Sequence, residues 1–87
     1  MYLLRILSVV LLSPPEILYQ RRYRCVIEYI TSAGDISVTG ITISVRMTPL
    51  QTWKINVQFS EPLDIEEALE REIQEYPNLV SYLRNFP

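Results

Sequence analysis

The chain has 87 residues, of which 48% are hydrophobic, and its net charge is −2. This length fits one domain over residues 1–87, and the apolar content excludes intrinsic disorder. The chain contains no histidine, one cysteine and two glycines. These counts exclude histidine-dependent catalysis, thiolate zinc sites and glycine-rich phosphate loops. We therefore expect a protein that is not an enzyme and that uses no cofactor or metal.

The first element is a strongly apolar run over residues 1–12. It is too short to cross a bilayer, which takes about 20 apolar residues. Arg5 lies inside the run, which argues against a signal peptide. The run predicts a strand buried on both faces, and its place at the centre or the edge of a sheet stays open. Cys25 has no partner for a disulfide, which favours the cytoplasm and no membrane partner.

The next segments predict a hairpin. Residues 13–16 contain two prolines and break regular structure. Residues 17–20 form either a short helical turn or an extended lead-in. Apolar and polar side chains alternate over residues 21–31, as in a strand, and residues 32–35 supply a turn. In the strand that follows, the apolar side chains change phase at Thr39 and Gly40, which predicts a bulge or a bend there.

The last elements predict a fourth strand and helices. Residues 53–59 show the clearest alternation in the chain. Asp64 and Glu67 have the spacing of a capping box at a helix start. The apolar stripe of that helix predicts contact with the strand over residues 53–59. Pro77 suits the first position of a second helix. The order predicts an α+β fold with a mostly antiparallel four-stranded sheet and C-terminal helices packed on one face.

Charge is divided along the chain. Residues 1–60 carry six cationic and three acidic side chains, a net charge of +3, whereas residues 61–87 carry two and seven, a net charge of −5. Carboxylates on a helix can occupy an arginine-rich site in place of phosphates. This charge pattern and a surplus of apolar residues predict a domain that binds a protein partner as a subunit, regulator or inhibitor. A second copy of the same chain is one such partner, which would give a homo-oligomer. The candidate protein-binding residues are Glu66, Glu67, Glu70, Tyr82 and Phe86.

An alternative function is the binding of single-stranded nucleic acid. Residues 19–24 contain three arginines and two tyrosines, and arginine binds phosphate while aromatic rings stack on bases. The isoelectric point near 5.0 argues against this alternative. It requires the cationic residues of three strands to share the open face of the sheet. The candidate residues are Arg22, Arg24, Arg46 and Lys54.

Overall fold

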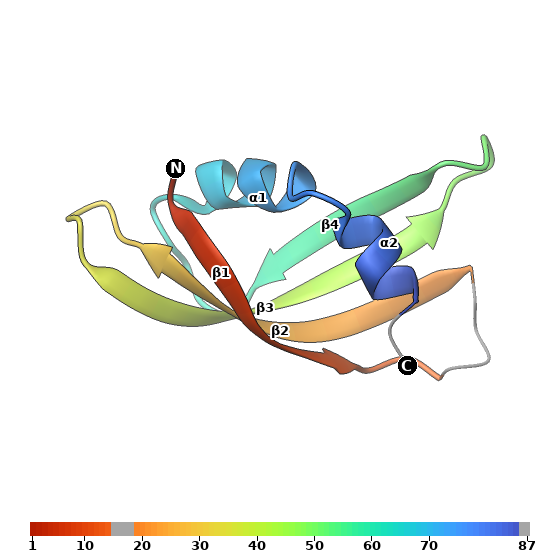
Figure 1. The fold of residues 1–87 in the computed structure, drawn as a ribbon, viewed down its shortest axis with the longest axis horizontal. Helices are drawn as coiled ribbons and strands as arrows, with labels where there is room; N and C mark the ends of the chain where they lie inside the picture. Colours follow the sequence, from red (N-terminus) through yellow and green to blue (C-terminus); the bar gives the residue numbers. More distant parts are fainter. Residues whose placement is uncertain (15–18, 86–87) are drawn as a thin grey trace.

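The structure, a computed structural model, describes residues 1–14 and 19–85. Four antiparallel strands form one sheet in the order β1-β2-β3-β4, and two helices follow them (Figure 1). This arrangement confirms the predicted α+β class. Of the lead-in predicted over residues 17–20, residues 17 and 18 lie outside the described residues. The elements are β1 (Leu3–Leu11), β2 (Gln20–Ile30), β3 (Ile36–Met47), β4 (Trp53–Phe59), α1 (Glu66–Gln74) and α2 (Leu79–Arg84).

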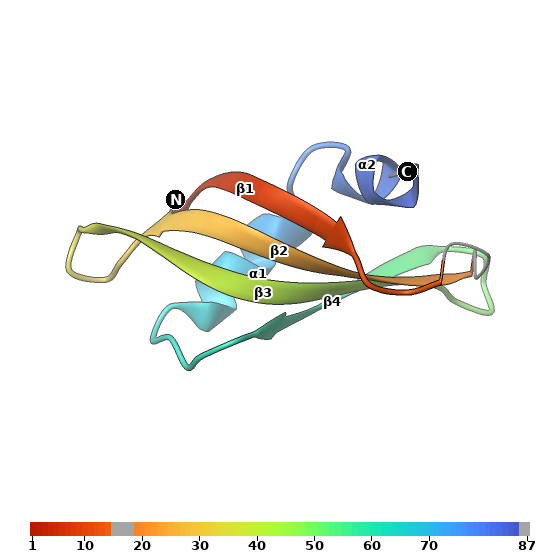
Figure 2. The same ribbon diagram turned by 90° about the horizontal axis from the view of Figure 1, so that it is seen from below.

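The core lies between one face of the sheet and the two helices. Successive side chains of a strand point to opposite faces, so alternate residues of β2, β3 and β4 meet the helices. Leu69 and Ile73 of α1 are fully buried against this face. The helix α1 contacts β1 and β4, and α2 contacts β3, so the predicted contact of the first helix with residues 53–59 is confirmed. Figure 2 shows the strands in front of α1. We call the face of the sheet that points away from the helices the open face.

The bulge predicted at Thr39 and Gly40 is wrong. The register between β2 and β3 is unbroken from Ile30↔Ile36 to Gln20↔Arg46. The apolar side chains change phase because Ile36 and Val38 are exposed, while Thr39 is buried. The pleat is therefore regular, and these apolar residues lie on the open face.

The interpretation of residues 1–12 as a strand buried on both faces is also wrong. In the described part of the chain, β1 is an edge strand that pairs only with β2. Its register shifts between Leu3 and Arg5 and again between Ile6 and Ser8. Both irregularities fall on the edge of the sheet, where bulges are common. Five apolar side chains of this segment are exposed, namely Met1, Leu4, Leu7, Val10 and Leu12.

The helix starts differ from the predicted ones. No side chain caps α1; Asp64 instead accepts a hydrogen bond from the Ser32 hydroxyl at 2.5 Å. Glu66 is the residue whose side chain folds back toward the chain before the helix: its carboxylate accepts a hydrogen bond from the Leu63 N–H at 2.8 Å. The predicted capping box of Asp64 and Glu67 is therefore wrong. The second helix begins at Leu79 rather than at Pro77, after a left-handed Asn78.

Candidate functional site

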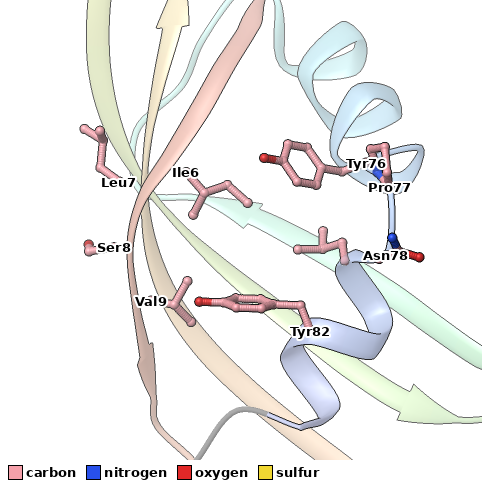
Figure 3. Close-up of a pocket in the computed structure, with 9 residues that line it drawn as sticks. Ile6, Leu7, Ser8, Val9, Tyr76, Pro77, Asn78 and Tyr82 are labelled. Atoms are coloured by element: carbon pink, nitrogen blue, oxygen red, sulfur yellow. The ribbon is translucent and has the colours of Figure 1, made fainter.

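A groove of about 510 Å³ runs between β1 and the segment that joins the two helices. Figure 3 shows Ile6 and Val9 pointing from β1 into this space, whereas Leu7 and Ser8 point away from it. The rings of Tyr76 and Tyr82 reach toward β1 from the opposite side. We call this hollow the edge groove. The lining residues used below are Ile6, Val9, Tyr76, Pro77, Leu79 and Tyr82.

The edge groove continues along β1 toward the N-terminus. A second hollow of about 320 Å³ shares Tyr76 and Pro77 with it and reaches Met1, Leu4 and Glu75. Ordinary core packing leaves few voids larger than a water molecule. Two adjoining hollows beside one strand therefore mark a stretch that the two helices leave uncovered.

The strand beside the groove is held to α1 by a carboxylate. Glu72 accepts hydrogen bonds from the backbone N–H groups of Tyr2 and Leu3 at 2.9 to 3.0 Å. Farther along, the Leu12 N–H donates to the Arg22 carbonyl of β2 at 2.8 Å. Because backbone groups alternate between the two sides of a strand, the N–H of Leu11 points outward from the sheet. The sheet therefore ends at β1 with backbone groups able to pair with another strand.

The candidate protein-binding residues do not form one site. Tyr82 lines the edge groove, whereas Glu66 and Glu67 lie in the first turn of α1, at the end remote from α2 (Figure 1), and Glu70 lies at the middle of the helix. Glu67 is exposed and Glu70 half-buried. Glu66 is half-buried too, and its carboxylate holds the Leu63 N–H. Phe86 lies outside the described residues.

The four candidate nucleic-acid-binding residues do come together. Lys54 stands opposite Arg46 in the β3–β4 register, and Arg46 stands opposite Gln20 in the β2–β3 register. Arg22 and Arg24 occupy the next two same-face positions of β2. All four cationic side chains are exposed. We call this set the basic patch: Arg22, Arg24, Arg46 and Lys54.

A glycine lies beneath one member of the patch. A Cβ added at Gly40 would approach the Arg24 guanidinium within 3.5 to 3.6 Å and the Ser60 hydroxyl within 2.9 Å. The tight approach is therefore to the Ser60 hydroxyl, whereas the Arg24 guanidinium lies at ordinary contact distance from such a Cβ.

The lone thiol is not part of either surface. Cys25 lies in the core, and burial raises its pKa from 9.0 to about 11. A thiol in this state is a poor nucleophile, since the thiolate is the reactive form.

Sequence reasoning missed the edge groove because its two walls are far apart in the chain. Ile6 and Val9 belong to a continuous apolar run in which no periodicity separates one face from the other. Tyr76 continues the apolar stripe of α1, yet it is exposed by 39%. That exposure marks it as available to a partner.

Comparisons with models of protein families, with curated proteins and with solved structures found no match. Among the described residues, no helix has the length and apolar content needed to cross a membrane.

Proposed function

We propose that this protein is a non-enzymatic protein-binding domain that takes up an extended segment of its partner alongside β1. The observation that carries the proposal is the edge groove, which lies beside a strand edge that no described strand pairs with. Addition of a strand to an exposed sheet edge is a common mode of peptide recognition. The backbone supplies affinity in this mode, and pockets for alternate side chains supply specificity.

The groove favours aliphatic or small aromatic side chains in the partner. A strand added next to β1 would turn alternate side chains toward Tyr76, Leu79 and Tyr82. The side chains between them would meet the exposed Leu7 and Val10. Both faces of the added strand would then bury apolar surface of β1 that is exposed at present.

The carboxylates of α1 favour a partner of positive charge. Glu75, the residue directly after α1, borders the second hollow and is exposed, and Glu67 is exposed in the first turn of α1. Opposite charges steer association and fix the direction of docking more than they raise affinity. This supports a subunit or regulator whose partner carries lysine or arginine beside its apolar residues. We place this function in the cytoplasm, because the only cysteine has no disulfide partner.

Selection of displayed peptides on the immobilised protein, followed by anisotropy titration of the enriched peptides, tests the proposal. Two variants target the site. Tyr82→Ala removes a wall of the groove, and Leu11→Pro removes an outward N–H at the last pair of the β1–β2 register. We expect peptides with alternating aliphatic residues, bound at least about 10-fold more weakly by either variant, as for an aromatic anchor of an interface.

Tyr19→Ala is the matched control, since Tyr19 is exposed by 67% and does not line the groove. This variant should bind as the wild type does. Peptide affinities that both site variants leave unchanged would overturn the proposal. Light scattering adds a further arm: a dimer that Leu11→Pro converts to a monomer would identify a second copy of the chain as the occupant.

A further inference from the structure

We propose that the open face of the sheet binds the phosphate backbone of a nucleic acid through the basic patch. This surface is separate from the edge groove, so the proposal does not depend on the proposed function. The side chains of the surface come from three alternate positions on each of β2, β3 and β4, which share one face of the sheet. The three cross-strand rows are Gln20, Arg46 and Lys54; Arg22, Ser44 and Asn56; and Arg24, Thr42 and Gln58.

The charge of these nine positions is unbalanced. Four are cationic, none is acidic and none is apolar. No member of the basic patch forms an ion pair or a side-chain hydrogen bond with another described residue. On the same face the exposed Arg5 is instead paired with Glu28 at 3.1 Å. The positive charge of the patch is therefore available to an external anion.

The composition of the surface favours a nucleic acid over an acidic protein. Protein interfaces have a desolvated core rich in aromatic and aliphatic residues, and the nine positions contain none. Phosphate and sugar contacts in protein–DNA complexes come from arginine and lysine together with serine, threonine, asparagine and glutamine. Three of the four cations are arginines, whose planar fork matches phosphate oxygens.

The dimensions also fit a backbone. Residues two apart on a strand lie about 6.8 Å apart, so the step from Gln20 to Arg24 spans about 14 Å. A nucleic-acid strand carries one phosphate per about 3.4 Å of helix axis, so about four phosphates pass over the patch. One phosphate is thus available for each cation.

The rest of the molecule fixes the direction of approach. Residues 61–87 have a net charge of −5. Figure 2 shows α1 behind the strands, and α2 packs on the same core side, where the Tyr23 hydroxyl donates to the Leu83 carbonyl. Phosphates are repelled from that side and attracted to the open face. The strands place no aromatic ring on the open face, because Trp53, Phe59 and the buried Tyr23 and Tyr29 all belong to the core side. The stacking expected for the single-stranded alternative is therefore absent there, and binding is independent of base sequence.

Fluorescence anisotropy tests the proposal with a labelled 20-nucleotide oligothymidine and a labelled 20-base-pair duplex, titrated between 50 and 200 mM salt. Four contacts predict a slope of log K against log salt of about −2.8 for a single strand, a loss of about 50-fold across this range. For a duplex the slope is about −3.6. Binding of either form with such a slope supports the proposal.

Variants then locate the contacts. Arg22→Gln should weaken binding and lower the salt slope by about 0.7 for a single strand. The fourfold change of the basic patch to glutamine should abolish binding, with an unchanged circular dichroism spectrum showing that the fold persists. Arg71→Gln on the exposed side of α1 is the matched control and should bind normally. Tyr82→Ala should also bind normally, since Tyr82 lies in the edge groove.

Three results would overturn the proposal. One is an affinity that does not respond to salt, and another is a fourfold variant that binds as the wild type does. The third is tighter binding of polyglutamate than of an oligonucleotide with the same number of charges, which would identify an acidic protein as the occupant.

Discussion

The carboxylate of Glu72 in α1 accepts a hydrogen bond from the backbone N–H of Leu3 at 2.9 Å, which joins the first strand to the first helix. The same carboxylate accepts from the Tyr2 N–H. Leu3 itself is buried by the core. The start of β1, and with it one wall of the edge groove, therefore depends on a contact between residues about seventy positions apart in the chain.

Replacement of Glu72 should therefore loosen β1. Glu72→Ala leaves two N–H groups without their acceptor, which costs about 1–3 kcal/mol of unfolding free energy. Urea unfolding monitored by circular dichroism measures this loss. Glu75→Ala is the control, because the carboxylate of this exposed residue accepts no hydrogen bond from the described residues. Equal stability of the two variants would contradict the role given to Glu72.

The phenol of Tyr23 holds α2 to the sheet. Its hydroxyl donates a buried hydrogen bond to the Leu83 carbonyl. Tyr23→Phe keeps the ring but leaves this carbonyl without the phenol, at a cost of about 1–3 kcal/mol. A melting temperature lowered by roughly 4–8 °C per kcal/mol is expected by calorimetry. Tyr19→Phe, at an exposed position, should melt like the wild type.

The single tryptophan reports the docking of α2. The Arg84 guanidinium lies 4.0 Å from the centroid of the Trp53 ring. Arg84→Ala uncovers this ring, so the emission maximum should shift to longer wavelength while stability falls by about 0.5–1 kcal/mol. Arg84→Lys should keep part of the effect. An unchanged emission spectrum in Arg84→Ala would show that the contact does not form in solution.

Stability should fall at alkaline pH through Cys25. Burial raises the pKa of this thiol from 9.0 to about 11 in the folded state, so the unfolded chain loses its proton first. The contribution of the neutral thiol is complete below pH 9 and is lost as the pH rises toward 11, up to about 2–3 kcal/mol. Urea unfolding at pH 8, 9 and 10 measures it. Cys25→Ala should show a shallower decline, and parallel curves would refute the assignment.

The sequence predicted the core strands correctly where alternation was clean. Tyr23, Cys25, Ile27 and the side chains of residues 53–59 lie on the faces that their spacing indicates. It failed where apolar residues are exposed. Ile36 is exposed by 69%, and hydrophobicity by itself does not say whether a partner covers such a side chain.

Of the two candidate sites, the sequence predicted the basic patch and missed the edge groove. The basic patch follows from strand parity, because a regular register carries cations of three strands to one face. The edge groove required knowledge of where residues 74–79 lie relative to β1. The path of this segment includes the left-handed Asn78, a conformation that asparagine favours but that its type alone does not determine.

The order of elements has a consequence for synthesis of the protein. Each strand pairs with the one before it, so the hairpins can close as soon as they leave the ribosome. Their cover, Leu69 and Leu83, comes last. At about 5–20 residues per second, the stretch from Phe59 to Arg84 takes roughly 1–5 s to make. During that interval the apolar face of the nascent sheet is exposed to chaperones and to neighbouring chains. Slow codons would lengthen this exposure, and rapid translation would shorten it.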